Sequence, residues 1–276
     1  PADWNDESKH SKLWLYNLHY FDDLNSIDSS KRKVLQKQFI LKWIKENPPL
    51  HGNGWEPYLL SLRLVNWVKW CQQNQDYDAE ILSSMEQQAD ALMAQLEFHI
   101  LGNHLFANAK ALVFVGCFLA SKRSDDYLAK GLELLSREVP EQFLADGGHF
   151  ELSPMYHCIL LWDLIDLYNL ASTSDDARFS SFYPEWKEVI ERGISWLSVM
   201  CHPDGDISFF NDAAFGIAPS PKEVFSFARS GGIFADEHEQ QSLIMLQDSG
   251  YSRLSKGPFT LFFDHAEVGP DYLPGH

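Results

Sequence analysis

The apolar residues of the chain recur mainly with the spacing of α-helices. Over most of the first 245 residues they return every three or four positions, which is typical of a helix with one buried face. Two stripes are clear: Val34, Leu35, Phe39, Trp43 and Ile44, then Leu59, Leu62, Val65, Trp67 and Trp70. The pattern predicts helices over about 31–46, 57–73, 79–98, 103–120, 125–144, 155–170, 185–201 and 221–229.

Four connectors between these segments are rich in glycine, asparagine, aspartate and aromatic residues. They cover 51–57, 100–104, 144–154 and 201–212, and two predicted helices separate each from the next. In an array of antiparallel helical hairpins, loops that recur once per hairpin lie at the same end. Curling the array gathers them around one mouth. The sequence therefore predicts a mainly α protein, an incomplete α/α toroid over residues 1–247.

The pattern changes from about residue 248. Two β-rich runs, 250–254 and 259–264, are separated by "SKGP". Two strands are marginally stable alone. We therefore interpret 248–276 as the first strands of an incomplete antiparallel β-sandwich domain.

Composition narrows the class of protein. The 276 residues carry 22 basic against 39 acidic side chains, a formal charge of −17, which excludes a typical nucleic-acid-binding protein. No apolar run is long enough to predict a membrane span. The four cysteines form no CxxC pair and lie in or beside apolar segments, so we expect buried free thiols. The polar N-terminus shows no signal peptide, although it begins with Pro rather than Met, which leaves the compartment open.

The stretch "GNHLFANAK" (102–110) is unusual, because it places polar side chains between two strongly apolar runs. A buried amide or imidazole without a partner costs about 1–3 kcal/mol. Asn103 and His104 open a predicted helix, where a capping role is the alternative to ligand binding. Lys110 returns to about the same helix face, so we expect it to bring a positive charge near the same loops.

A second polar stretch, "DGGHFELSPMYHC" (146–158), precedes another apolar helix. Pro154 suits the first turn of that helix. His149, Tyr156 and His157 are then candidates for a site, with hydrogen-bonded core groups as the alternative. From the loop 202–212, Asn211 is a further candidate, with turn formation as its alternative.

The stretch "NGWEPYLLSLRLVNWVKW" (53–70) brings Trp55, Glu56 and Tyr58 together, with Arg63 further along the helix. Exposed aromatic rings suit stacking on sugars, and an arginine suits a carboxylate. The alternative is an aromatic core with a structural Arg–Glu pair. The sequence holds no P-loop, GxGxxG, GxSxG or HExxH motif, and its histidines lack regular metal-ligand spacing.

Together these stretches resemble the heparinase II/III-like polysaccharide lyases. The resemblance runs through "WLYNLHYFDDL", "NPPLHGNGWEPYLLSLRLVNWVKW", "GNHLFANAKAL", "EQFLADGGHFELSPMYH" and "HPDGDISFFND", then "DSGYSRL" and "GPDYLPGH". It implies an α/α toroid followed by a β-sandwich, an acidic polysaccharide as the partner, and a periplasmic location, or a cytoplasmic one if no signal peptide was removed. The polymer and the oligomeric state are left open.

The resemblance also implies roles for individual residues. Asn103 matches the asparagine that binds the uronate carboxylate, His104 the adjacent histidine, and Tyr156 the catalytic tyrosine. His276 matches the first histidine of a Gly-His-x-His pattern. The second histidine, which can bind a structural zinc in relatives, is absent. The resemblance therefore implies no cofactor in this chain and allows a structural zinc in the missing β domain.

These matches predict cleavage by β-elimination, with Asn103 and His104 neutralising the C5 carboxylate and Tyr156 as acid and base. A phenol titrates near pH 10, so we expect cationic neighbours around Tyr156. The runner-up enzyme is a glycoside hydrolase, which needs two carboxylates; the candidates are Glu56, Asp146, Glu151 and Asp212. The third hypothesis is a non-catalytic protein that binds acidic glycans or assists polysaccharide biosynthesis.

Overall fold

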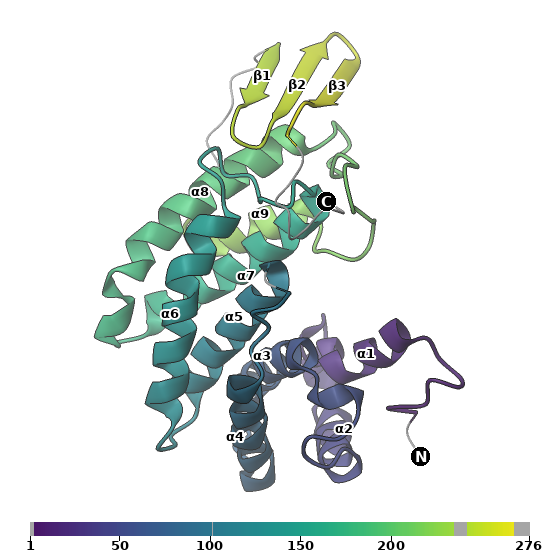
Figure 1. The fold of residues 1–276 in the computed structure, drawn as a ribbon, viewed down its shortest axis with the longest axis vertical. Coiled ribbons are helices and arrows are strands. Elements are labelled where there is room, and N and C mark those ends of the chain that lie inside the picture. The colour runs from purple at the N-terminus through teal and green to yellow at the C-terminus, as the bar shows by residue number, and fades with distance from the viewer. Residues whose placement is uncertain (1–2, 101, 235–241, 268–276) are drawn as a thin grey trace. The chain divides into compact units, whose positions relative to one another are not determined.

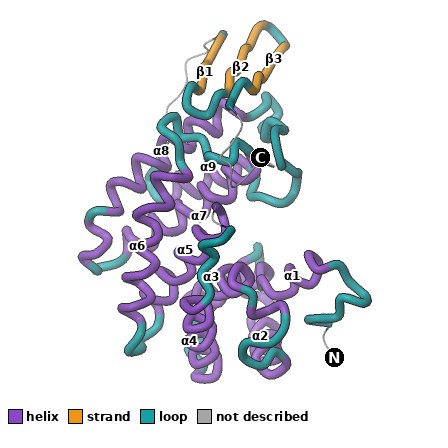
Figure 2. Tube along the Cα trace, in the orientation of Figure 1, coloured by secondary structure: helices purple, strands orange, loops and turns teal. Residues whose placement is uncertain are grey.

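The computed structural model describes residues 3–100, 102–234 and 242–267, and this part is mainly helical (Figures 1 and 2). The helices are α1 (Lys12–Tyr20), α2 (Lys33–Glu46), α3 (Pro57–Asn74), α4 (Ala79–Ala94), α5 (Gly102–Phe118), α6 (Ser124–Gln142), α7 (Pro154–Thr173), α8 (Phe182–Met200) and α9 (Pro221–Ser230). Short 3-10 turns cover Asp22–Asn25, Ser29–Arg32, Asn53–Trp55 and Ala177–Ser180. The strands are β1 (Leu243–Leu246), β2 (Tyr251–Lys256) and β3 (Phe259–Asp264).

All of the predicted helices are present, with ends that differ by a few residues. The sequence analysis missed α1, which has only nine residues and buries only Leu15 and His19, too few for a periodic signal. It also missed the four-residue strand β1. The mainly α class with a small antiparallel sheet is confirmed.

The chain forms two compact units, Pro1–Leu135 and Ser136–His276. The first unit holds α1 to α5 and most of α6, and the second holds α7 to α9 with the sheet. The predicted domain boundary at 247, which was based on the change from helical to strand-like sequence, stays a prediction.

The core of the first unit is built around α3, which contacts α1, α4 and α5. Trp67 and Trp70 on α3 and Trp43 on α2 are fully buried. The predicted apolar stripe of α2 is wrong at three positions, because Val34 is 74% exposed and Leu35 and Phe39 are also exposed, whereas Trp43 is buried as predicted. The buried positions of α2 are instead Gln36, Ile40 and Trp43. Gln36 belongs there because its amide oxygen accepts a hydrogen bond from Trp70 Nε1 at 3.0 Å.

In the second unit, the three strands pair antiparallel in the order β1-β2-β3. Leu246 and Tyr251 are buried against Trp196, Val199 and Met200 of α8, so one face of the sheet lies on the end of that helix (Figure 1). The other face carries five exposed apolar side chains: Leu243, Met245, Phe259, Leu261 and Phe263. Such a face is typical of a sheet that packs against a further layer. The predicted β-sandwich itself extends beyond the described residues and stays a prediction.

A buried polar cluster fixes the loop 144–154 to the turn between β1 and β2. Asp146 Oδ2 accepts hydrogen bonds from the Ser249 backbone N–H at 2.7 Å and hydroxyl at 2.8 Å. Trp196 Nε1 donates to the same hydroxyl oxygen at 2.8 Å. The carboxylate of Asp146 is thereby used for structure, which removes it from the acids available to a hydrolase.

The structure also tests the predictions about the cysteines and about membrane spans. All four cysteines are free; Cys71, Cys158 and Cys201 are buried as expected, whereas Cys117 is exposed. Across residues 3–100, 102–234 and 242–267, no helix has the length and apolar character needed to cross a membrane.

Helices α5 and α6 approach closely at Gly131. A Cβ atom there would lie 2.8 Å from the Ala109 carbonyl oxygen and 2.9 Å from the Val113 backbone nitrogen. Gly131→Ala should therefore lower the free energy of unfolding by about 1–3 kcal/mol, although alanine is the better helix former by about 1 kcal/mol. Urea unfolding followed by circular dichroism measures this.

The control is Gly193→Ala in α8, where the new methyl group meets the end of the Leu161 side chain at 2.9 Å rather than backbone. We expect a smaller loss there. Equal stability of Gly131→Ala and the unchanged protein would contradict the close packing.

Candidate functional site

Asn103 and His104 lie in the first turn of α5, which begins at Gly102. Asn103 is therefore inside the helix rather than at the capping position. Both side chains are half-buried. Within the described part of the chain, the Asn103 amide makes no hydrogen bond, and it stands at the positive end of the helix dipole. This amide remains available to a ligand.

The His104 ring is held on two sides. Its Nδ1 lies 3.0 Å from Glu97 Oε1. The Tyr58 ring packs against the imidazole with a centroid distance of 4.4 Å and an interplanar angle of 30°. The structure thus places two of the predicted residues, Tyr58 and His104, against each other, and adds Glu97, which the sequence analysis did not select. Asn103 precedes His104 in the same turn of α5.

Asn108 is one of the polar residues in the apolar stretch "GNHLFANAK", and hydrogen bonds within the protein explain its presence there. Its Oδ1 accepts from the Glu97 backbone N–H at 3.0 Å, and its Nδ2 donates to Glu97 Oε2 at 2.9 Å and Ser61 Oγ at 3.0 Å. The amide is fully buried and satisfied by protein groups, so its role is structural. Lys110 is also buried, with its Nζ 5.5 Å from the centroid of the Phe114 ring. The prediction that Lys110 brings a positive charge near the loops of the site is therefore wrong, because its side chain is buried.

The stretch 53–70 divides into exposed and buried groups. Glu56 is 39% exposed; it accepts a hydrogen bond from the Tyr16 hydroxyl and lies 3.3 Å from Lys12 Nζ. Trp55 is only 5% exposed, and its Nε1 donates to the Asn47 carbonyl oxygen. Trp55 belongs to the core with Trp43, so its predicted stacking on a sugar is wrong.

Arg63 is fully buried inside the first unit. Its guanidinium donates to Gln88 Oε1 at 2.8 Å, the Gly54 carbonyl at 2.7 Å and the His19 carbonyl at 3.3 Å. It lies 3.9 Å from the centroid of the Trp43 ring, and burial lowers its pKa. The predicted contact of Arg63 with a substrate carboxylate is corrected to a structural role, because no part of the side chain reaches the surface.

Gly54 belongs to the same cluster. A Cβ atom at this position would lie 2.6 Å from His19 Nδ1, so only glycine permits the close approach of the two segments. His19 accepts from Trp43 Nε1 at 2.9 Å and lies 3.0 Å from the Trp4 carbonyl oxygen. Burial lowers its pKa to about 4, which makes it a neutral core histidine.

Tyr156 lies in the first turn of α7 in the second unit and is half-buried. Burial raises the pKa of its phenol, as do the charges of Asp212 and Glu151 and a hydrogen bond with Asp212. The sequence analysis expected cations that lower this pKa. The described neighbours shift it in the opposite direction.

The two histidines beside Tyr156 do not supply that positive charge. His157 is fully buried against Trp196 at a ring distance of 4.4 Å, and its Nε2 donates to the Gly193 carbonyl at 3.0 Å. Burial lowers its pKa to about 4, so the ring is neutral at physiological pH. His149 is fully buried as well, with Nε2 at 3.3 Å from Gln142 Oε1. The predicted substrate contacts of both are wrong, because neither ring is exposed.

Asn211 shapes the backbone that leads into α7. Its Nδ2 donates to the Leu152 carbonyl at 2.9 Å and to the Tyr251 hydroxyl at 3.1 Å. That hydroxyl donates to the same carbonyl at 2.6 Å. Leu152 has a positive φ of 56°, a strained conformation that these bonds hold in place. The Asn211 amide is thus engaged by the protein, although the residue is exposed.

His276 lies outside the described residues. In the part of the chain that the structure does cover, no three histidine, cysteine or acidic side chains gather in a way that suits a metal ion. A zinc site in a further β domain stays a prediction.

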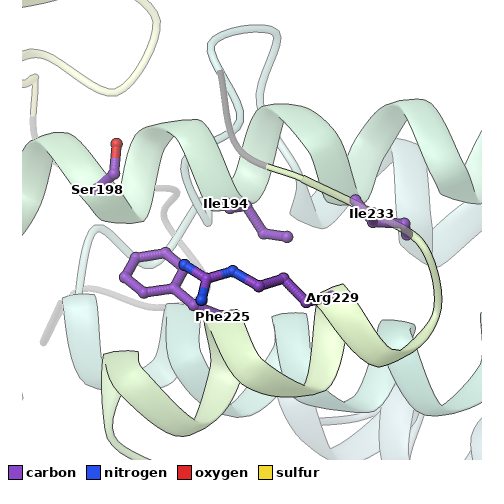
Figure 3. A pocket seen from close by; sticks show the side chains of 5 residues that line it. All are labelled: Ile194, Ser198, Phe225, Arg229 and Ile233. Atoms are coloured by element: carbon purple, nitrogen blue, oxygen red, sulfur yellow. The ribbon is translucent and has the colours of Figure 1, made fainter. Parts of the chain in front are cut away.

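A surface cavity of about 180 Å³ lies between α8 and α9, lined by Ile194, Ser198, Phe225, Arg229 and Ile233 (Figure 3). The Ser198 hydroxyl donates to the Ser195 carbonyl oxygen at 2.7 Å. A cavity of about 220 Å³ lies beside the loop 206–221, with Cys158 and Glu223 among its lining residues. None of the predicted site residues that the structure describes lines either cavity, so neither cavity matches the predicted site.

The family model for the heparinase II/III N-terminus matches residues 3–239. The chain belongs to this family. It is 24% identical over 220 residues to a heparin-sulfate lyase of Bacteroides thetaiotaomicron, which covers 75% of this chain and 30% of that protein. A heparin-sulfate lyase of Bacteroides stercoris is 31% identical over 114 residues, 41% of this chain and 17% of that protein.

Another relative is not named as a lyase. The FtsZ-localized protein C of Caulobacter vibrioides is 25% identical over 286 residues, with 96% of this chain and 44% of that protein covered. Its name describes a location and no lyase activity. The chain spans less than half of each of these relatives.

Solved structures show the fold of this family. A heparinase III crystal structure matches 99% of this chain and 47% of its own with a TM-score of 0.71 and 20% identity. A mutant of the heparan sulfate lyase HepC from Pedobacter heparinus matches 92% of this chain and 45% of its own with a TM-score of 0.61 and 19% identity. The chain therefore shares its fold with the N-terminal part of heparinase III.

The two asparagines of α5 should differ sharply in their effect on stability. Asn108→Ala should lower the free energy of unfolding by about 2 kcal/mol or more, because it leaves the Glu97 carboxylate and backbone N–H buried without their partner. Asn103→Ala should change it by less than about 0.5 kcal/mol, as at an ordinary surface position. Urea unfolding of both variants measures the difference; similar losses would contradict the assignment of Asn103 to a ligand.

Proposed function

We propose that this protein is the N-terminal part of a polysaccharide lyase that cleaves a uronate-containing polysaccharide by β-elimination. Membership of the heparinase II/III family and two relatives named as heparin-sulfate lyases support this. The observation that carries the proposal is the first turn of α5. There Asn103, whose amide makes no hydrogen bond with the described residues, directly precedes His104, and Glu97 and Tyr58 hold the His104 ring in place.

The chemistry explains why such a pair is needed. In β-elimination the C5 proton of a uronate leaves, the C4–O bond breaks and a C4–C5 double bond forms. The C5 proton is barely acidic, because the neighbouring carboxylate already carries a negative charge. Hydrogen-bond donors on that carboxylate stabilise the enolate-like intermediate in which charge develops. The Asn103 amide donates without ionising, and a protonated His104 adds a positive charge.

Tyr156 is the proposed acid and base. As a phenolate it takes the C5 proton, and the phenol that results returns this proton to the leaving oxygen at C4. The mechanism requires that Tyr156 reach the sugar whose carboxylate Asn103 binds. Because burial and the nearby carboxylates raise the pKa of Tyr156, the phenolate is scarce at neutral pH, and bound substrate or residues outside those described would have to favour it.

A second candidate function is binding of an acidic glycan without turnover. Two observations favour it: the carboxylates that disfavour the Tyr156 phenolate, and the relative named for its location. A glycoside hydrolase has less support, because Asp146 is bonded to Ser249 and Glu151 is buried. A product without 4,5-unsaturation would favour the hydrolase.

Tyr156→Phe should abolish formation of the unsaturated uronate and leave the fold intact, since only one half-buried hydroxyl is removed. The product is followed by its ultraviolet absorbance with a panel of uronate polymers, and circular dichroism checks the fold. Tyr168→Phe, which removes a phenol from the same helix, is the control and should retain activity. Full activity of Tyr156→Phe would remove this residue from the mechanism.

Asp212→Asn should lower the pKa of Tyr156, because it removes a negative charge that disfavours the phenolate. The tyrosinate absorbance that Tyr156→Phe eliminates should then appear at lower pH. Any elimination rate that depends on the phenolate should rise at a lower pH as well.

The control for this titration is Asp204→Asn, an exposed aspartate in the same loop whose charge does not shift the pKa of Tyr156. It should leave the titration unchanged. A titration that Asp212→Asn also leaves unchanged would show that Asp212 does not face the phenol.

A further inference from the structure

The His104 ring is tied to the protein core through Glu97. The Glu97 carboxylate is almost fully buried, whereas the His104 side chain is 32% exposed. One carboxylate oxygen, Oε1, lies 3.0 Å from His104 Nδ1, and the other accepts from Asn108 Nδ2 at 2.9 Å. Glu97 thus connects a half-exposed ring to a buried amide.

Glu97 is itself fixed by several bonds. Asn108 holds both its backbone N–H and its carboxylate. The Asn108 amide also donates to Ser61 Oγ, and the Ser61 hydroxyl donates to the Pro57 carbonyl in the first turn of α3 at 2.9 Å. The carboxylate therefore has a defined position before any ligand arrives.

This position dictates which nitrogen of His104 carries a proton. An ionised carboxylate only accepts hydrogen bonds, so Nδ1 must be the donor towards Glu97. The other nitrogen, Nε2, makes no hydrogen bond within the described residues. The Tyr58 ring packs against the imidazole at a tilt of 30° and restricts its rotation.

We infer that Glu97 is a positioning residue that keeps His104 protonated on Nδ1 and reserves Nε2 for the uronate carboxylate. The inference deepens the proposed lyase function and rests on it. When a sugar acid binds at Nε2, the imidazole lies between two carboxylates and carries both protons, one shared with each. Glu97 thereby supports the positive charge that the elimination requires.

Glu97→Gln gives a specific test, because the surroundings determine how the new amide turns. Asn108 presents only a donor, Nδ2, to this side chain, so the glutamine oxygen faces Asn108 and its NH₂ group faces His104. Nδ1 must then accept, and the proton moves to Nε2. The ring stays in place, but its neutral form changes from the Nδ1–H to the Nε2–H tautomer.

Nitrogen-15 NMR of histidine side chains distinguishes these forms, and His104→Gln identifies the resonances. At about pH 8 the unchanged protein should show His104 with a proton on Nδ1, the nitrogen that faces Glu97. Glu97→Gln should show the Nε2–H form. Glu80→Gln, an exposed glutamate on α4, is the matched control and should show no change.

Turnover of a uronate oligosaccharide gives the second readout. Glu97→Gln should lower kcat/KM by about 10- to 100-fold, because the charged partner of His104 is lost. A neutral Nε2–H form in the unchanged protein, which needs no variant to observe, would overturn the inference. The expected tautomers without any turnover by the full-length protein would support the positioning by Glu97 and contradict the lyase function.

Discussion

The candidate site depends on one buried carboxylate. Glu97 has to be held by Asn108, whose amide also donates to Ser61, because an ionised group without partners is costly in the interior of a protein. The same bonds fix the segment that precedes α5 and orient His104. Stability and the orientation of a proposed ligand-binding ring thus come from the same contacts, and a change in this network should affect both.

The sequence predicted the helices well, because long apolar segments with a clear period leave few alternatives. It predicted burial less well where a polar group finds a specific partner. Gln36 replaces Val34 in the core because it bonds Trp70, and Arg63 is buried because Gln88 and two carbonyl groups receive its donors. Such partners lie far apart in the sequence, so no local pattern reveals them.

The prediction of the site was incomplete for the same reason: some of its contacts join residues that no local sequence pattern connects. The short loop and helix start around Asn103 and His104 are visible in the sequence, whereas Glu97 carries no signal of its own beyond its place before an apolar helix. Trp55 and His157 show the opposite error. Their residue types suit a sugar site, but aromatic rings and neutral histidines also fill protein cores, and here they do.

The first and second units contribute different chemistry to the proposed reaction. In our proposal Asn103 and His104 of the first unit donate to the sugar acid, and the second unit supplies the Tyr156 phenol, whose pKa the carboxylates of Asp212 and Glu151 raise. A substrate carboxylate adds further negative charge, so the proposed elimination needs Asn103 and His104 to be well ordered as hydrogen-bond donors. The contact with Glu97 matters because it orients the His104 ring.

The central claim is that Asn103, His104 and Tyr156 act on one sugar residue. A crystal structure of the inactive Tyr156→Phe protein with a uronate tetrasaccharide tests it most directly. We predict a carboxylate about 3 Å from Asn103 Nδ2 and His104 Nε2, with the ring of residue 156 facing C5 of the same sugar. An oligosaccharide bound away from Asn103, or with residue 156 out of reach of that C5, would contradict the claim.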